Sequence, residues 1–182
     1  MPNVILTDER GSPIGQEEII KAHTGEGRLH KAFSVYVFRN ARSQILIQRR
    51  SMKKMLWPHI WANTACSHPF EKESPVEAGT RRLKQEMGIT CALEEAGDLV
   101  YRAEDPGRGV EHEHVTLLVG DVEQNTEINS NPDEVAEWKW INIGALEKDM
   151  KEHPDFYAPW FQLGLPIVLG KGRNPPPHRI AA

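Results

Sequence analysis

The sequence predicts an α+β fold in which a mixed β-sheet is covered by helices. Two observations lead to this expectation. Several β-rich runs occur along the chain with few helical segments between them, and one segment near the middle carries complete helix start and stop signals. With 182 residues, of which 39% are hydrophobic and 26% charged, the chain has the size and composition of one globular domain. We expect this domain at residues 1–170, followed by a Pro-rich tail at 171–182.

The strand signals occur in an order that suits such a sheet. Residues 32–38 and 45–48 are rich in β-branched and aromatic side chains, and the polar residues between them indicate a hairpin with a longer loop. Three further strands are expected at residues 98–102, 113–120 and 137–141.

The clearest helix begins after Ser74. Residues 74–77 read Ser-Pro-Val-Glu, which is a capping box with proline at the first helical position, and Gly88 supplies the C-terminal stop. On this helix Arg82 and Glu86 are neighbours at i and i+4, which indicates either a surface ion pair or an anion contact beside a magnesium contact. Two later helices are expected, one at residues 144–152 and one that begins near Asp155.

Charge and targeting signals narrow the class of protein. A formal net charge of −4 argues against a protein whose main task is to coat nucleic acid or an anionic membrane. The most apolar late stretch, residues 163–169, is interrupted by Gly164 and Pro166, and residues 1–11 are too short and charged for a signal peptide. Two cysteines do not make a disulfide framework. We therefore expect a cytoplasmic protein with no membrane or nucleic-acid partner.

Two segments carry side chains of the kinds that bind metal ions. His23 and His30 are separated by six residues in a turn-rich segment, a spacing that surface histidines also show. Glu111 and Glu113 alternate with two histidines, and in a strand residues i and i+2 face the same way. Adjacent carboxylates repel unless a cation or a shared proton offsets the repulsion. A cation site and an exposed strand end both account for this pattern.

Two further segments indicate reactive or anion-binding chemistry. Cys66 precedes His68 by two residues, so the pair is either a thiolate with an imidazole or a buried structural cysteine beside a histidine. The basic run at residues 49–54 either holds phosphate groups or forms a solvated loop. Cys91 has no such neighbours and is expected to be structural.

The loop and helix at residues 67–89 resemble a degraded Nudix box, whose pattern is Gly, five residues, Glu, seven residues, Arg-Glu-apolar-x-Glu-Glu-x-Gly-apolar. Glu73, Arg81, Glu86 and Gly88 match, whereas Ser67, Arg82 and Gln85 replace a glycine and two glutamates. Nudix hydrolases use those glutamates to bind the magnesium ions that activate water on a diphosphate. The resemblance therefore implies an incomplete hydrolytic set.

Three other segments extend the resemblance: HTGEGRLHKA at 23–32, WPHIWANTACSHP at 57–69 and YRAEDPGRGVEHE at 101–113. With the altered box, residues 4–160 are similar to the type I isopentenyl-diphosphate Δ-isomerases. This similarity implies a Nudix-like α/β/α sandwich with a central mixed sheet. It also implies reversible conversion of isopentenyl diphosphate to dimethylallyl diphosphate in isoprenoid biosynthesis, by protonation and deprotonation of the alkene.

The same resemblance implies the site residues. One divalent ion, Mn²⁺, Zn²⁺ or Mg²⁺, is expected on His23, His30, His68, Glu111 and Glu113, and His112 and His114 are expected to be non-ligands. Proton transfer falls to Cys66 on one face of the alkene and to Glu113 with Tyr101 on the other, and Trp160 covers the reacting carbon.

The diphosphate end is implied in the same way. A clamp for the substrate diphosphate is expected from Lys21, Arg50, Lys54 and Arg82. A magnesium ion that accompanies the diphosphate is expected on Glu86 and the main-chain carbonyl of Cys66. The expected partner is this small molecule, and the chain is expected to be a monomer or a weak homodimer.

Two other functions are compatible with parts of the sequence. A Nudix-type diphosphohydrolase would use the same fold, but Arg82 and Gln85 replace its glutamates and hydrolysis does not need Cys66. A non-catalytic, metal-stabilised module would use residues 49–54 on RNA or on a phosphorylated partner, with an affinity that falls as salt rises.

Overall fold

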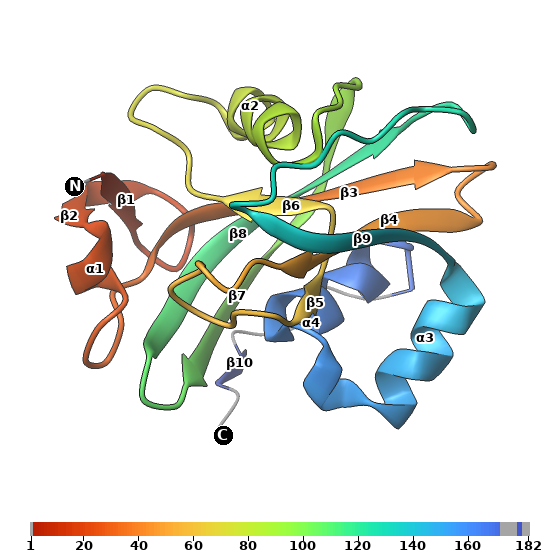
Figure 1. Cartoon of the computed structure of the whole chain (residues 1–182). Coiled ribbons are helices and arrows are strands. Elements are labelled where there is room, and N and C mark those ends of the chain that lie inside the picture. The colour runs from red at the N-terminus through yellow and green to blue at the C-terminus, as the bar shows by residue number, and fades with distance from the viewer. Residues whose placement is uncertain (1, 172–177, 180–182) are drawn as a thin grey trace.

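The fold is described from a computed structural model that covers residues 2–171 and 178–179. A curled mixed sheet is covered by helices on both sides, and a short helix lies near the N-terminus (Figure 1). The elements are β1 (Asn3–Thr7), β2 (Pro13–Glu18), α1 (Ile19–Ala22), β3 (His30–Arg39), β4 (Gln44–Arg50), β5 (Trp61–Ala62), β6 (Ala65–Ser67), α2 (Pro75–Met87), β7 (Leu93–Asp105), β8 (Gly109–Asp121), β9 (Val135–Asn142), α3 (Ile143–Glu152), the 3₁₀ turn η1 (Pro154–Phe156), α4 (Pro159–Val168) and β10 (His178–Arg179).

Strand β3 is the centre of the sheet. Nearly all its residues are buried, as expected for a strand covered on both faces. It runs parallel to β8, with His30 opposite Glu113. Along its other edge it pairs with β1, β6 and β4 in turn, and in the β6 pairing Ser34 lies opposite Cys66. On the far side of β8, the long antiparallel partner β7 brings Tyr101 opposite Glu113.

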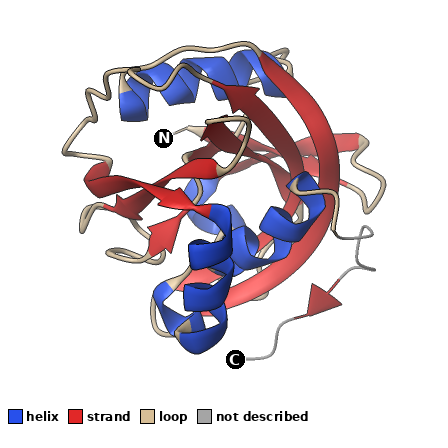
Figure 2. Ribbon diagram, turned by 90° about the vertical axis from the view of Figure 1, so that its right-hand side faces the viewer, coloured by secondary structure: helices blue, strands red, loops and turns tan. Residues whose placement is uncertain are grey.

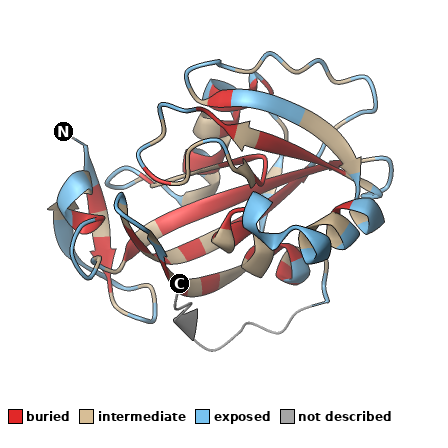
Figure 3. Ribbon diagram, turned by 60° about the horizontal axis from the view of Figure 1, so that its bottom comes forward, coloured by how far each residue is buried: buried red, intermediate tan, exposed pale blue. Residues whose placement is uncertain are grey.

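Each face of the sheet has its own apolar core, which makes the molecule a sandwich (Figure 2). Under α2, the buried residues Phe33 and Val35 of β3 pack in one cluster with Leu83 and Met87 of the helix. On the opposite face, Tyr36 packs in one cluster with Trp160 and Phe161 of α4. In the burial colouring, the buried residues gather on the inner strands (Figure 3). The predicted α/β/α sandwich with a mixed sheet is confirmed.

The predicted helix from Ser74 is confirmed with its caps. The Glu77 amide donates to the Ser74 hydroxyl at 3.2 Å, and the Ser74 amide donates to the Glu77 carboxylate at 2.8 Å. Gly88 ends the helix with φ of 71°, a left-handed conformation that suits glycine. The expected hairpin joins β3 to β4, and residues 144–152 lie within α3.

The start of the last helix was predicted wrongly. Asp155 lies in the turn η1, and α4 begins only at Pro159. The reason is a tertiary contact, because the Ala158 amide donates to the Trp61 carbonyl at 2.8 Å and Tyr157 is extended beside Trp61. The chain therefore does not become α-helical until Pro159.

Several elements carry no clear sequence signal. The N-terminal hairpin of β1 and β2 and the short strands β5 and β6 were not predicted; β2 is mostly exposed and β5 has only two residues. The predicted tail begins at Lys171, and most of it lies outside the described residues. No helix in the described part of the chain is long and apolar enough to cross a membrane.

Helix α4 lies close to the sheet at Gly164. A Cβ atom added there would lie 2.2 Å from the hydroxyl oxygen of Tyr36 and 3.2 Å from a methyl carbon of Leu117. Tyr36 is fully buried, so it has little room to yield. Because Trp160 is on the same helix, this close approach sets how deeply Trp160 reaches into the molecule.

Gly164→Ala is expected to lower the free energy of unfolding by about 1–3 kcal/mol through overpacking. The measurement is urea unfolding followed by fluorescence. Gly144→Ala is the matched control, since an added Cβ in α3 meets only the Asn142 side-chain oxygen at 3.4 Å; it should be neutral or stabilise by about 0.5–1 kcal/mol. Equal effects of the two substitutions would contradict the close docking of α4.

Candidate active site

One cavity brings together most of the predicted site residues. Its volume is about 180 Å³, and its lining includes Cys66, His68, Arg82, Glu111, Glu113 and Trp160. These side chains come from β6, the loop after it, α2, β8 and α4. The cavity therefore opens where the edge of β3 passes from one partner strand to the next.

Four side chains converge at one end of this cavity. His23, His30, His68 and Glu113 each offer a ligand atom, and these atoms all lie within 4.8 Å of one another. Strand register explains much of the convergence, because His30 and Glu113 are opposite each other on β3 and β8. The Nε2 atoms of His30 and His68 are 3.1 Å apart, and His68 Nε2 is 3.1 Å from a Glu113 oxygen. We call this set the histidine group.

The outer contacts of the histidine group favour metal binding. His23 Nδ1 lies 2.7 Å from the Ile19 carbonyl oxygen and His30 Nδ1 lies 2.6 Å from that of Arg28. A proton on each Nδ1 leaves Nε2 as the ligand atom, which is the usual arrangement around a bound ion. Burial, followed by the nearby His68 and His30, lowers the pKa of His23 to about 4, and burial lowers that of His68. Neutral imidazoles are the form that binds divalent ions.

Glu111 is placed differently from the other predicted ligands. Its ligand atoms are not part of the histidine group, although it lines the same cavity. The Tyr101 hydroxyl hydrogen-bonds to Glu111 and also to a Glu113 oxygen at 3.0 Å. Burial and the Glu113 carboxylate raise the pKa of Glu111, whereas Glu113 has a lowered pKa because its bonds to His30 and His68 outweigh its burial. One tyrosine thus links the histidine group to a second carboxylate.

Cys66 lies beside this pair on β6. Burial raises the pKa of its thiol to about 12, so the neutral thiol is the resting form. Arg50 Nη1 is 3.6 Å from the sulfur, and Nε and Nη2 of Arg50 donate to the main-chain carbonyls of Trp57 at 3.0 Å and Leu56 at 2.8 Å. Arg50 is therefore a buried residue that holds the loop at Leu56 and Trp57, and it also brings a positive charge to the cavity lining.

Trp160 is held over the cavity by a residue that the sequence did not single out. Its indole N–H donates to the Asn63 side-chain oxygen at 2.9 Å, and the Asn63 amide donates to the carbonyls of Val35 and Ala65. Trp57 packs edge-on against Trp160 with ring centroids 5.5 Å apart. Asn63 lies within the segment WPHIWANTACSHP at residues 57–69, but only the fold shows which groups it contacts.

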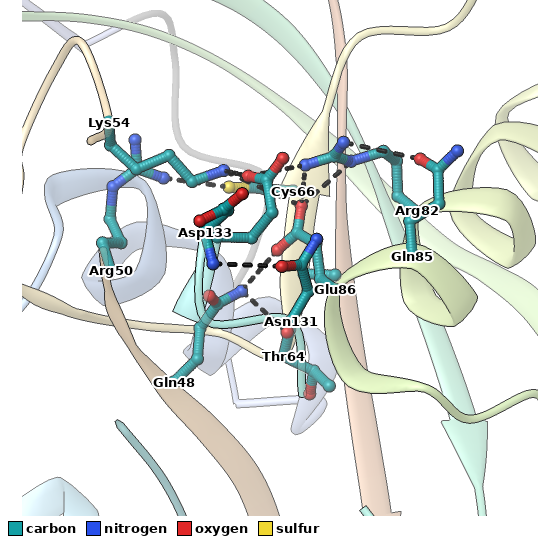
Figure 4. Close-up of polar contacts among 12 residues, drawn as sticks. Gln48, Arg50, Lys54, Thr64, Cys66, Arg82, Gln85, Glu86, Asn131 and Asp133 are labelled. Carbon is teal, nitrogen blue, oxygen red and sulfur yellow. Dashed lines mark hydrogen bonds and ion pairs between the residues drawn. The ribbon is translucent and has the colours of Figure 1, made fainter. Parts of the chain in front are cut away.

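The basic end of the cavity contains two of the predicted clamp cations, Lys54 and Arg82, and the predicted magnesium ligand Glu86 (Figure 4). Arg82 pairs with Glu86, which is 1% exposed and accepts a 2.8 Å hydrogen bond from Gln48. Glu134, from the loop before β9, pairs with both Lys54 and Arg82. Sequence reasoning missed Glu134, because its partner Lys54 is 80 residues away.

Lys21 is the predicted clamp residue that the fold places apart. It is exposed on the short helix α1, and the cavity lining includes Ile19 and His23 but not Lys21. The side chain that faces the cavity from this helix is thus apolar.

Comparison with known proteins identifies the family. A family model described as NUDIX domain matches residues 28–162. The isopentenyl-diphosphate Delta-isomerase of Dinoroseobacter shibae is 40% identical over 154 residues, which is 84% of each chain. The protein of that name from Halorhodospira halophila is 36% identical over 163 residues, 89% of this chain and 92% of that one. The chain belongs to the isopentenyl-diphosphate Delta-isomerase family.

Solved structures share the fold at lower identity. DR0079 from Deinococcus radiodurans superimposes with a TM-score of 0.64 at 16% identity, over 82% of this chain and 89% of that chain. An Ap4A hydrolase from C. elegans superimposes with a TM-score of 0.54 at 22% identity, over 78% and 93%. This member of the isomerase family thus has the Nudix fold.

His68→Ala is expected to weaken Zn²⁺ binding at least about ten-fold, because it removes one of the four converging ligand atoms. Competition with a chromophoric chelator measures the affinity. His114→Ala is the matched control, since His114 is on the same strand as Glu113 but its Nε2 lies 3.8 Å from Asp98, outside the histidine group. If both variants bound Zn²⁺ equally well, the histidine group would not be the metal site.

Proposed function

We propose that this protein interconverts isopentenyl diphosphate and dimethylallyl diphosphate, with Cys66 and the Glu113–Tyr101 pair as its proton-transfer groups. The observation that carries the proposal is that Cys66, Glu113 and Trp160 border one small cavity whose other end is basic. Moving a double bond requires one proton to be added at the terminal carbon and one to be removed from the methylene beside the alkene. The reaction is reversible and consumes no other reactant, so a donor and an acceptor that exchange roles are sufficient.

The residues of the cavity suit both sides of this exchange. Cys66 carries a thiol proton at rest, and Glu113 is linked to the hydroxyl proton of Tyr101. An alkene that lies between them receives a proton from one group while the other accepts a proton. In the reverse reaction the roles change over.

The histidine group fits a resident divalent ion, since three imidazoles and a carboxylate form a mixed N/O donor set. Such an ion, when bound, supplies positive charge that orients Glu113 and acidifies the protons linked to it. Its identity among Mn²⁺, Zn²⁺ and Mg²⁺ stays a prediction. Glu111, which shares the Tyr101 hydroxyl with Glu113, stays a predicted further ligand of this ion.

The basic end fits the diphosphate with its magnesium ion. Glu86 and the Cys66 carbonyl would hold this ion, which neutralises phosphate charge when bound. Gln48 Oε1, beside Glu86, is buried without a hydrogen-bond partner among the described residues, which suits an added ligand there. Arg50, Lys54 and Arg82 line the same end and would bind the phosphate oxygens; Lys21 would need to swing in from the surface.

Trp160 suits the stabilisation of the carbocation that forms when the alkene is protonated. An indole face is attractive to a positive carbon by up to about 2 kcal/mol when water is excluded. Water also has to be absent because it would trap the cation as an alcohol. Trp160 is 3% exposed and its indole N–H is fixed by Asn63, so it provides a buried, fixed part of the cavity wall.

The hydrolase alternative is not favoured by the geometry. Two of the acidic positions of the Nudix box are Arg82 and Gln85, and Arg82 pairs with the remaining Glu86. A cation therefore lies where a hydrolase would gather further carboxylates. The placement in the cytoplasm stays a prediction. The monomer or weak homodimer stays a prediction.

Cys66→Ala is expected to lower kcat for isomerisation by about 10²–10⁴-fold, the usual contribution of one positioned acid or base. Proton NMR in deuterated water with isopentenyl diphosphate and Mg²⁺ measures the product and its deuterium content, and phosphorus NMR detects any phosphate release.

Cys91→Ala is the matched control, because Cys91 is a partly buried thiol that lies away from the cavity. Its turnover should stay close to that of the unaltered protein. Full activity of Cys66→Ala, or phosphate release by the unaltered protein, would contradict the proposed chemistry.

A further inference from the structure

Four charged side chains alternate in sign around the basic end of the cavity. Lys54 pairs with Glu134, Glu134 lies 3.2 Å from Arg82, Arg82 pairs with Glu86, and Glu86 lies 4.0 Å from Lys54. We call this closed ring of two cations and two carboxylates the charge quartet. Lys54, Arg82 and Glu86 are labelled in Figure 4. Its formal charge is zero, so the two clamp cations are already neutralised by the chain itself.

The two carboxylates of the charge quartet differ in how firmly they are held. Glu86 is on helix α2 and 1% exposed, and a hydrogen bond from the buried Gln48 fixes its second oxygen. The Glu134 side chain is 27% exposed, comes from a loop, and has only Lys54 and Arg82 as charged partners among the described residues. Glu134 is thus the carboxylate that can leave the cations at low cost.

Glu134 also has the geometry of a bound anion. One of its oxygens contacts both cations, which is the bridging contact that a phosphate oxygen makes with a lysine and an arginine. Burial and these two cations together leave the pKa of Glu134 below its ordinary value, so it is ionised at neutral pH.

We propose that Glu134 is an internal competitor of the substrate diphosphate: it occupies the Lys54–Arg82 clamp in the empty site and is displaced when a diphosphate binds. This rests on the proposed function, which places the diphosphate at this clamp. Glu134 therefore sets specificity by charge. A metal-free diphosphate has to displace the Glu134 carboxylate from a neutral ring and leaves an excess of negative charge. A diphosphate that carries Mg²⁺ brings positive charge that offsets this excess.

Glu134→Gln tests the proposal, because the amide keeps the size and an acceptor oxygen but removes the charge. The probe is inorganic pyrophosphate, and calorimetry measures its binding with chelator and with excess Mg²⁺. We expect Glu134→Gln to bind metal-free pyrophosphate about ten-fold more tightly than the unaltered protein. The gain should be smaller with Mg²⁺. The ratio of the pyrophosphate affinity with Mg²⁺ to that without it should therefore be smaller in Glu134→Gln than in the unaltered protein. Glu134→Ala should shift the affinity in the same direction.

Asp133→Asn is the matched control. It removes one negative charge from the neighbouring residue, but Asp133 pairs at 2.6 Å with the exposed Lys53 rather than with the clamp. Its affinity for pyrophosphate should stay within about two-fold, which separates direct competition from the long-range effect of net charge. Thermal unfolding of each variant checks that the fold is kept.

Unchanged or weaker metal-free binding by both Glu134 variants would overturn the proposal, and so would an equal gain in Asp133→Asn. Lys54→Gln separates this result from failure of the proposed function. If Lys54→Gln weakens pyrophosphate binding while Glu134→Gln has no effect, the clamp is correct and only the competitor is refuted. If Lys54→Gln also has no effect, the diphosphate does not bind at this clamp and both proposals fall.

Discussion

Two carboxylates buried side by side on β8 are the constraint on which the rest of the site depends. Glu111 and Glu113 are each 8% exposed, and buried charges are costly unless hydrogen bonds or opposite charges compensate them. Strand pairing supplies that compensation: β7 places Tyr101 between the two carboxylates, and β3 places His30 beside Glu113. The curled sheet is thus what allows an acidic group to exist inside the molecule, and it leaves that group aimed at a cavity.

Strand β3 also links the histidine group to Cys66. Ser34 is four residues beyond His30 on β3, and Cys66 lies opposite it on β6. Side chains of alternate strand residues share a face, so His30 and Ser34 face the same side of the sheet. The spacing between His30 of the histidine group and Cys66 is therefore fixed by backbone hydrogen bonds between strands, which gives this part of the site a rigid geometry.

The sequence was most informative where chemistry or capping is local. The Ser74 capping box, the β3–β4 hairpin and the same-face glutamates followed from spacing alone, and family resemblance joined His23, His30 and His68 into one expected site. It was least informative where a contact joins distant segments. The start of α4 depends on the Ala158–Trp61 hydrogen bond. The contact of Asn63 with Trp160 and the pairing of Glu134 with Lys54 likewise join segments that are far apart in the sequence. None of these contacts has a period or motif, because each depends on how separate elements pack.

The two ends of the cavity reach charge balance in opposite ways. At the histidine group the chain supplies an excess of donor atoms, with neutral imidazoles around a carboxylate that keeps its negative charge, so this end favours a cation that stays. At the charge quartet every cation already has a carboxylate, so this end favours a ligand that binds and leaves. Under the proposed function, a turnover enzyme needs that asymmetry: a resident ion would have to stay through many cycles, whereas a diphosphate held by unpaired lysine and arginine would be released slowly. A clamp whose cations are paired with carboxylates would give up affinity for the diphosphate and gain product release.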